Sequence, residues 1–359
     1  MAINPAMNFD PAQVLIREIE DLSQQIANSD LPDQLKQKAN REIMSLQRSI
    51  QLNNYDEKYE TVSRYIHWLL RIPWTKVTED NLDLNYAKAI FEKHHYGMPE
   101  IKDRFIELIA QRNLIQQQTP DQAPRSPVIL LVGLVGTGKT TFAYSLAEAL
   151  GRVLVRIPFG GMSSSKELRG TSRLHLGSEP GKVIQGLCDV GVRNPIFLLD
   201  EIDRVAEEAR NDIMGVLVEL LDPAQNNAFE DNYIDYPVDL SKAIFIATAN
   251  NTTHIATAVM DRMEKISMPS YSDEEKLVIA KRYILPKLFA QTGLRPEQLI
   301  IEEDLWPQIL RPLGYDMGIR SLERTLENVF RKAIRIIVER GFNEVYVNKQ
   351  NAKIFLPQN

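Results

Sequence analysis

Apolar residues recur at helical spacing along the first 50 positions of the chain. Residues three or four positions apart lie on one face of a helix. Here they are Ile16, Ile19, Leu22 and Ile26, followed by Leu35, Ile43, Leu46 and Ile50. The polar break at 29–32 ends in Pro32, which suits an early position in a new helix. The pattern predicts two amphipathic helices, paired as a hairpin or coiled coil, and it fits a packing arm as well as a partner-binding arm.

Similar spacing predicts three more helices before residue 115, over 57–70, 84–94 and 99–114. The first of these ends before Pro73, because proline lacks the N–H that a continuing helix needs. The next segment, 116–127, is polar and contains three prolines, which is typical of a linker. We therefore expect a helical arm over 1–115 and a linker over 116–127.

Beyond the linker, continuous apolar runs replace the amphipathic pattern. The runs at 128–132, 196–200 and 243–248 each predict a buried strand, and an apolar stretch at 141–150 predicts a helix between the first two. Strands without polar alternation, separated by helices, indicate a parallel sheet that is covered on both faces. We therefore predict an α/β subdomain over 128–269.

The last ninety residues return to helical spacing. Helices are expected at 274–288, 303–310 and 319–340, which predicts a small helical subdomain over 270–359. Two short apolar runs, 345–347 and 354–356, follow. We expect them to pair as a short hairpin.

Composition excludes several kinds of protein. The 48 acidic and 42 basic residues give a net charge of −6, which argues against a sequence-wide electrostatic grip on nucleic acid. No apolar run approaches the roughly 20 residues that cross a bilayer, and residues 1–10 lack the pattern of a secretory signal. We expect neither a nucleic-acid partner nor membrane insertion.

The single cysteine, Cys188, excludes an intrachain disulfide and fits the reducing cytoplasm. It lies in an apolar helical pattern over 183–188, so we expect a buried small side chain rather than a reactive thiol.

Residues 133–140 read Gly-Leu-Val-Gly-Thr-Gly-Lys-Thr and match G-x-x-x-x-G-K-[ST] in full. The match lies directly between the predicted strand at 128–132 and the predicted helix at 141–150. Glycines let backbone amides face phosphate oxygens, and the helix N-terminus adds partial positive charge. Lys139 can reach the β- and γ-phosphates and the Thr140 hydroxyl can ligate Mg²⁺. We expect ATP and Mg²⁺ to be held by Gly133, Gly136, Thr137, Gly138, Lys139, Thr140 and Thr141.

A phosphate loop needs a carboxylate at the tip of a neighbouring strand to hold the metal. The apolar run 196–199 delivers Asp200 to that edge, where ligands bind in open α/β folds. Glu201 follows it and is placed to polarise the attacking water as a general base. The alternative is a pair of surface carboxylates that cap a following helix.

Three more polar residues can reach a bound phosphate. Asn250, with Asn251 as the second choice, follows the strand predicted at 243–248 and can hydrogen-bond the γ-phosphate or the water, although asparagine is also a common turn residue. Arg262 can act as an arginine finger on a neighbouring subunit, or it can pair with a surface carboxylate. Arg320, at the start of the last long helix, can reach back from a lid.

Together and in this order, these segments resemble the Lon protease family and its AAA+ ATPase module, over roughly residues 57–356. The similar segments are 68–74, 78–84, His95-Tyr96-Gly97, 169–170, 177–181, 194–195 with 197–201, 221–226, 261–264 and 318–320. The resemblance implies a P-loop AAA+ parallel sheet flanked by helices, with an N-terminal helical arm and a C-terminal helical lid.

The resemblance also implies roles for individual residues. It makes His95 and Tyr96 adenine contacts, Asn250 and Arg320 the two sensors, and Arg262 the finger that acts on the next subunit. It further implies a homo-oligomer, a hexameric ring that threads unfolded protein through its centre, with His175 and Leu176 at the position of the pore loop.

The chain departs from the family at three places. Leu134-Val135 stands where Lon has two prolines, His175 stands where the pore loop has an aromatic residue, and 210–213 replaces a stretch that typically reads R-G-D-P. We expect nucleotide binding to survive the first change. Losing the aromatic residue weakens the inference of strong substrate pulling.

Lon also has a serine–lysine peptidase domain and an N-terminal substrate-binding domain, and neither pattern is found in these residues. Ser165-Lys166 are adjacent in a polar loop, which does not suit a dyad, so we expect no peptidase activity unless a separate peptidase is a partner. The leading hypothesis is an ATP-driven motor that unfolds and translocates proteins. The alternatives are a regulatory ATPase that remodels a partner without threading it and, with little support from the charge, a nucleic-acid motor.

Overall fold

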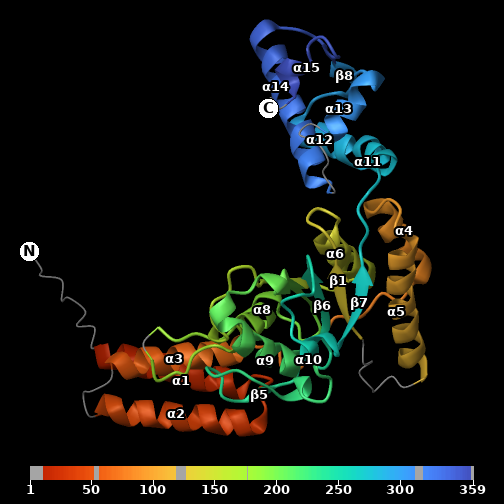
Figure 1. The fold of residues 1–359 in the computed structure, drawn as a ribbon. Helices are drawn as coiled ribbons and strands as arrows, with labels where there is room; N and C mark the ends of the chain where they lie inside the picture. The colour runs from red at the N-terminus through yellow and green to blue at the C-terminus, as the bar shows by residue number, and fades with distance from the viewer. Residues whose placement is uncertain (1–10, 52–55, 119–126, 176, 312–317, 357–359) are drawn as a thin grey trace, which may run out of the picture.

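The computed structural model describes residues 11–51, 56–118, 127–175, 177–311 and 318–356. In Figure 1 these residues form three tiers, with a helical arm in red and orange at the base, an α/β layer in the middle, and a helical lid in blue at the top. The fold class predicted from the sequence is therefore confirmed for the described residues.

Three helices of the predicted 1–115 segment are called the arm from here on: α1 (Pro11–Ala27), α2 (Asp33–Gln51) and α3 (Asp56–Arg71), which lie side by side in Figure 1. The predicted apolar stripe faces inward, because Ile19, Ile26 and Leu35 are fully buried. The break between α1 and α2 falls at the predicted Pro32, whose carbonyl accepts the backbone N–H of Leu35. The arm shares one hydrophobic cluster with the α/β subdomain, so it packs firmly against that subdomain.

Five parallel strands form the central sheet in the order β2-β3-β6-β1-β7. They are β1 (Val128–Val132), β2 (Leu154–Pro158), β3 (Ile196–Asp200), β6 (Ile244–Ala249) and β7 (Met263–Ser267). The sequence predicted β1, β3 and β6 because their residues are almost entirely buried. It did not predict the two edge strands, β2 and β7, which alternate buried with more exposed positions.

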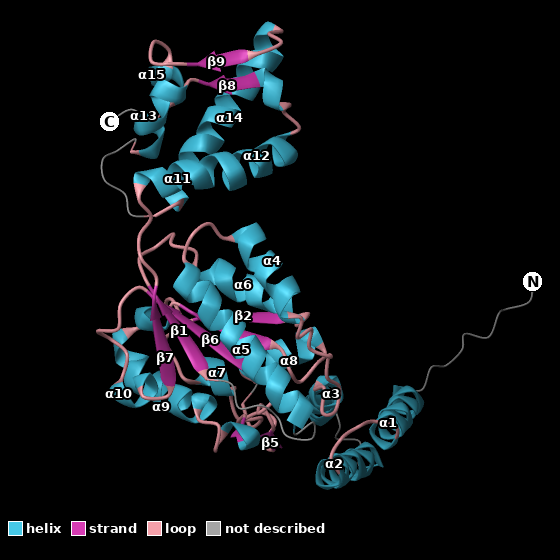
Figure 2. Ribbon diagram, turned by 90° about the vertical axis from the view of Figure 1, so that its right-hand side faces the viewer, coloured by secondary structure: helices cyan, strands magenta, loops and turns pink. Residues whose placement is uncertain are grey.

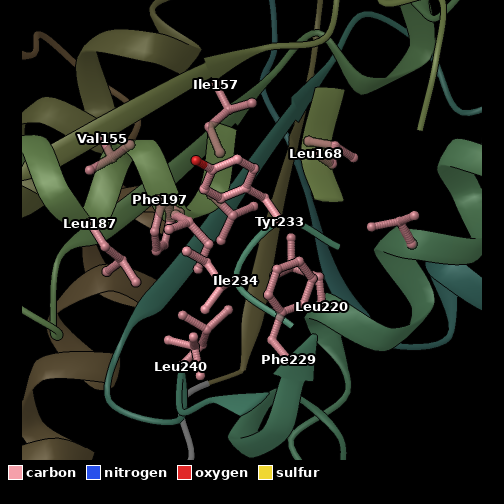
Figure 3. Close-up of a cluster of buried hydrophobic side chains, with 14 of the residues drawn as sticks. Val155, Ile157, Leu168, Leu187, Phe197, Leu220, Phe229, Tyr233, Ile234 and Leu240 are labelled. Atoms are coloured by element: carbon pink, nitrogen blue, oxygen red, sulfur yellow. The ribbon is translucent and has the colours of Figure 1, made fainter. Parts of the chain in front are cut away.

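The two faces of the sheet pack against different helices. Leu130, Phe197 and Ala247 face α8 (Lys182–Val190) and α9 (Arg210–Leu221), together with the arm. Figure 3 shows Phe197 of this face among Leu187 and other buried apolar side chains. The strand residues that alternate with these point to the opposite face. That face packs against α6 (Lys139–Leu150), α4 (Leu84–His94) and α5 (Pro99–Gln118), as Figure 2 shows. The alternation of strand side chains thus gives the sheet a helical layer on each side.

Charged residues hold the connection between α3 and α4 against the sheet. The largely buried carboxylate of Asp80 accepts hydrogen bonds from Arg152 and Arg112, at 2.5 Å and 3.0 Å. Despite its burial, the two guanidinium groups hold the pKa of Asp80 below its usual value. The Arg152 side chain also donates to the Asn194 carbonyl. This network positions α4 beside the phosphate loop.

The lid has its own apolar core. Its helices are α11 (Asp273–Ile279), α12 (Leu285–Thr292), α13 (Trp306–Leu310), α14 (Arg320–Arg340) and α15 (Ala352–Phe355), and a π-helical turn at Ala280–Ile284 joins the first two. Ser272 and Glu275 form a capping box that starts the lid's first helix. The remaining elements of the α/β subdomain are short: α7 (Lys166–Arg169), α10 (Thr257–Met260), β4 (Phe229–Glu230) and β5 (Pro237–Val238).

The predicted C-terminal hairpin is wrong. The run Val345–Val347 is a strand, β9, but it pairs in parallel with β8 (Leu299–Ile301). Residues 354–356 instead belong to or follow α15, whose Phe355 is buried in the lid core. The Asn348 side chain accepts the backbone N–H groups of Gln350 and Asn351, which turns the chain into a helix rather than back along β9.

Two other sequence predictions meet the structure here. Cys188 lies buried in α8, and burial raises the pKa of its thiol to about 12. None of the helices in the described ranges has the length and apolar character that crossing a membrane requires.

Candidate functional site

A cavity of about 480 Å³ opens where the carboxyl edge of the sheet meets the lid. Most of the residues predicted from the sequence line it. They are His95, Tyr96, Gly136, Gly138, Lys139, Thr140, Thr141, Asp200, Glu201, Asn250 and Arg320. Three others, Gly133, Thr137 and Arg262, are not among its lining residues. Parallel strands bring their carboxyl ends to one edge, which explains how residues so far apart in sequence converge.

The phosphate loop has a backbone that only glycine adopts easily. Gly136 and Gly138 have φ angles of 83° and 96°, in the left-handed region. A Cβ on Gly133 would lie 2.7 Å from the Met268 carbonyl oxygen, so this position has no room for a side chain. The Thr137 hydroxyl donates to the Leu134 carbonyl at 2.9 Å. The loop is therefore fully formed although prolines are absent from it.

The Lys139 side chain turns back into the loop. Its Nζ donates to the carbonyl oxygens of Gly133 and Leu134, at 2.6 Å and 2.9 Å, and to Asn250 Oδ1 at 3.1 Å. Burial lowers the pKa of Lys139, and the nearby Asp203 opposes that effect. A buried ammonium held by neutral oxygens is well placed to bind an anionic oxygen in the cavity.

The carboxylate of Asp200 is engaged on both oxygens. Oδ1 accepts the Thr248 hydroxyl at 2.6 Å and lies 3.4 Å from the Thr140 hydroxyl. Oδ2 accepts two hydrogen bonds from Arg156, at 2.8 Å and 2.6 Å. Arg156 was not among the residues predicted from the sequence, and it lies in the edge strand β2, which was not predicted either. A charged residue inside an otherwise apolar strand was the available signal.

The donor set at Asp200 fits Mg²⁺. The Thr140 hydroxyl and the Asp200 carboxylate are hard oxygen donors on neighbouring elements. Mg²⁺ usually takes one or two carboxylates and completes its shell with waters and substrate phosphates. Throughout the residues that the structure describes, no group of three or more acidic, histidine or cysteine side chains could hold a metal. The two protein donors at Asp200 and Thr140 leave room for the waters and phosphate oxygens that complete such a shell.

One buried hydroxyl positions both acids. The Thr248 Oγ1 that donates to Asp200 also accepts the backbone N–H of Glu201 at 2.9 Å. Glu201 has a φ of 59°, a left-handed conformation that costs free energy for a residue other than glycine and is found most often at functional sites. Its carboxylate lies 3.5 Å from Arg204 Nη1 and lines the cavity. Sequence reasoning missed Thr248, because its role depends on the neighbouring strand.

Asn250 presents an unused donor. Its Oδ1 accepts Lys139, and its backbone N–H donates to Asp203 at 3.1 Å. Its Nδ2 is buried without a partner among the described residues, an arrangement that costs free energy unless a ligand supplies an acceptor. The alternative residue, Asn251, uses its side chain to accept the Thr253 N–H in a local turn. The structure therefore directs Asn250, not Asn251, to the cavity.

The far end of the cavity is aromatic. His95 Nε2 lies 2.8 Å from the Ser145 hydroxyl, and its ring stacks on Phe142 with centroids 3.6 Å apart. Burial lowers the pKa of His95 to about 3, so its ring is neutral at pH 7. Tyr96, Tyr271, Tyr283 and Ile279 complete this end of the lining. The Tyr271 hydroxyl donates to the Thr137 carbonyl at 3.2 Å, which joins the aromatic end to the phosphate loop.

The lid contacts the phosphate loop directly. The Ile319 N–H donates to the Gly136 carbonyl at 3.1 Å. A Cβ on Gly318 would lie 2.4 Å from the Val135 carbonyl oxygen, so glycine is required for this approach. Arg320 follows as the first residue of α14 and faces the same cavity. The lid therefore supplies one wall of the site.

Arg262 and the proposed pore loop lie elsewhere. The Arg262 guanidinium donates to the Ala258 carbonyl at 2.7 Å and to Asp222 at 3.1 Å, so its own chain holds it away from the cavity. His175 is exposed, and its neighbour Leu174 is 92% exposed. Leu176, the other pore-loop residue, lies outside the described residues.

Two models of known protein families match parts of the chain. Residues 129–271 match the model of the AAA family, "ATPase family associated with various cellular activities", and residues 290–345 match that of the "Lon protease AAA+ ATPase lid domain".

Similar curated proteins include Lon protease 2 of Thermus thermophilus, which is 39% identical over 95% of this chain and 43% of its own length. The Lon proteases of Trichlorobacter lovleyi and Heliobacterium modesticaldum are 38% and 39% identical over 94% of this chain, and over 40% and 41% of theirs. The chain thus spans about two fifths of the length of the relatives it matches.

Proposed function

The chain is an AAA+ module of the Lon type, an AAA domain followed by a Lon lid, and on that basis we propose that it is a Mg²⁺-dependent ATP hydrolase that drives the unfolding and translocation of proteins. The observation that carries the proposal is the meeting of Lys139, Asp200 and Asn250 at one cavity beneath the lid. ATP is the substrate and Mg²⁺ the cofactor.

Each residue of the site has a distinct task in this proposal. The loop amides and Lys139 bind the β- and γ-phosphates. Thr140 and Asp200 would hold Mg²⁺, which would supply positive charge beside the transferring phosphoryl group. Asn250 uses its free Nδ2 to orient the γ-phosphate or the water, and Glu201 accepts the proton of that water. Arg320 contacts the phosphates from the lid.

The base of ATP would occupy the aromatic end. The turn that contains His95 and Tyr96 contacts adenine in this proposal, with the apolar side chains of the lid closing the pocket. The neutral His95 ring packs against Phe142 and Ser145. We therefore propose that His95 supports the 95–97 turn and that the Tyr96 side chain meets adenine.

The proposed oligomer follows from the position of Arg262. Its own chain holds it outside the cavity, which suits a finger that completes the site of a neighbouring subunit. We propose a hexameric ring in the cytoplasm, acting on protein substrates. In this scheme His175 and Leu176 line the central pore, and peptide cleavage is supplied by a peptidase domain or partner beyond these residues.

The decisive experiment replaces the general base. We expect Glu201→Gln to reduce ATP turnover by about 10²–10⁴-fold, because the amide cannot accept the proton of the water. Binding of a fluorescent ATP analogue should persist, because the amide leaves the phosphate loop intact. Glu208→Gln is the matched control, since Glu208 is an exposed acid outside the cavity. Unchanged turnover in Glu201→Gln would rule out this base.

A second candidate function is the remodelling of a partner protein without threading. It is favoured by His175, an exposed side chain at the position where the resemblance to Lon implies an aromatic pore-loop residue. His175→Tyr separates the two candidates. If the substitution creates unfolding of a tagged substrate that the natural chain does not unfold, the remodelling function is the better description.

A further inference from the structure

The exposed Leu174–His175 step belongs to a segment, 170–175, that the helical arm grips directly. Arg173 of this segment places its guanidinium 3.8 Å from the centre of the Tyr65 ring on α3. The same group lies 3.5 Å from Glu42 on α2 and 4.0 Å from Asp235. A cation that stacks on an aromatic ring and faces two carboxylates is fixed in both position and direction. Arg173 is thus a joint between the arm and this segment.

The arm grips a second segment, 231–237, with the same helices. Lys38 on α2 donates to the Asp235 carboxylate at 2.5 Å, and the Tyr65 hydroxyl donates to the Ile234 carbonyl at 3.1 Å. Tyr65 also meets Tyr233 edge to face, with centroids 6.1 Å apart. Asp235 has a φ of 51°, a conformation that the surrounding contacts must hold in place.

The two segments face one another and are anchored differently. Residues of both segments line a cavity of about 450 Å³, together with Lys166 and Glu230, which lie outside the two segments. The 231–237 segment is fixed from the sheet side, because Tyr233 and Ile234 insert into the buried cluster shown in Figure 3. Leu174 and His175, by contrast, are exposed. The backbone of 170–175 is also held by its neighbours, since Ser178 Oγ donates to the Ser172 and His175 carbonyls and Asn232 Nδ2 donates to the Gly170 carbonyl. Arg173 adds the contact of this segment with the arm.

We propose that Arg173 is a positioning residue that ties the helical arm to the 170–175 segment and so sets the direction in which Leu174 and His175 face an unfolded protein chain. The inference rests on the proposed function, since it assigns that segment the contact with substrate. The arm is then more than a packing element, because a displacement of α2 or α3 moves the segment with it.

Arg71 provides a matched comparison for this role. It also joins the arm to the α/β subdomain, through an ion pair with Asp189 at 3.0 Å and stacking on Trp68. Asp189 lies on α8, outside both gripped segments. If Arg173 only stabilised the contact between the arm and the α/β subdomain, removing either arginine would change the order of the 170–175 segment equally.

Hydrogen exchange of the full chain tests the joint independently of activity. The His175 N–H donates to the Ser172 carbonyl at 3.2 Å, so its exchange reports the order of the segment. We expect at least about tenfold faster exchange at His175 in Arg173→Gln, less than about twofold in Arg71→Gln, and partial protection in Arg173→Lys, which keeps the charge. Equal exchange at His175 in the two glutamine variants would overturn the proposal.

Stimulation of ATP hydrolysis tests the consequence for substrate. The probe is reduced and carboxymethylated α-lactalbumin, a permanently unfolded protein. We expect Arg173→Gln to raise the probe concentration for half-maximal stimulation by about tenfold with little change in the maximal rate, because a misdirected segment weakens contact and not chemistry. An unaltered half-maximal concentration beside faster exchange would restrict Arg173 to a structural role. If the natural chain shows no stimulation at all, the assignment of the substrate fails. The exchange data still show whether Arg173 ties the arm to the 170–175 segment.

Discussion

The charged side chains at the phosphate end of the cavity and at the Arg262 corner differ in what they contact and in whether they line the cavity. At the phosphate end, Lys139 donates to Asn250 within one chain, and both residues line one space together with Asp200. At the other corner, Arg262 is bound to Asp222 and Ala258 of its own chain and lines no part of that space. The first group is assembled by the register of the sheet. We propose that Arg262 instead reaches the phosphate bound by a neighbouring copy of the chain.

That difference shows which contributions a single chain can complete. Strand order places β6 between β3 and β1, so the tips that carry Asp200 and Asn250 necessarily lie beside the phosphate loop. Arg262 directly precedes β7, which runs parallel to β1, so it lies at the opposite, amino end of the sheet. Substitutions at the two places should therefore differ in whether a second copy can restore what they remove.

The largest expected effect is at Arg262. We expect Arg262→Ala to lower ATP hydrolysis by about 10³-fold, because the charge that develops on the phosphoryl group loses its counter-charge. Binding of an ATP analogue to the same chain should remain. The measurement is steady-state turnover beside fluorescence titration with the analogue.

Mixing sharpens this test. Combined with inactive Lys139→Ala chains, Arg262→Ala chains should regain part of the activity, because a mixed interface joins an intact phosphate loop to an intact arginine. Chains that carry both substitutions provide the control and should restore nothing. Mixtures that stay as inactive as the single variants would count against a role in trans.

A smaller loss is expected at Thr248, on the single-chain side of the comparison. Thr248→Val keeps the shape of the side chain but removes the hydroxyl that holds both Asp200 and the Glu201 N–H. We expect turnover to fall by about 10²-fold through misplacement of the metal ligand and base. Thr253→Val, at an exposed position, is the control. Mixing Thr248→Val with Lys139→Ala chains should restore no activity, because each substitution disables the site of its own chain. A recovery in this mixture would show that a second copy can supply what Thr248 provides.

The smallest expected effect is a pH dependence of stability that arises from His95 at the aromatic end of the cavity. The pKa of His95 falls from 6.5 to about 3 on burial, so between these values the unfolded chain binds a proton that the folded chain does not. Stability therefore decreases as pH falls below 6.5, by at most about 1.4 kcal/mol per pH unit from this group. His95→Gln should flatten the dependence of the free energy of unfolding between pH 6.5 and 5.

Urea unfolding at several pH values provides that measurement. His67→Gln, which replaces an exposed histidine on α3, is the matched variant and should keep the natural slope. An unchanged slope in His95→Gln would mean that another buried group causes the acid sensitivity.

Local pattern predicted the elements whose surroundings are uniform. The helices of the arm follow a single apolar stripe, and β1, β3 and β6 are buried along nearly their whole length. The edge strands were not predicted because some of their side chains meet solvent, so that polar residues such as Arg156 interrupt the apolar run. The predicted hairpin failed because β9 found its partner in β8, at a distance along the chain that no local turn signal reports.

The sequence by itself determined the phosphate loop, the acidic pair after a buried strand, and the order of helices and strands, because each is written in neighbouring residues. Only the tertiary structure decided that Arg156 and Thr248 hold Asp200, that Ile319 closes on Gly136, and that Arg173 reaches Tyr65. These contacts join segments far apart along the chain, and their existence depends on which faces of the sheet and arm come together in the folded state.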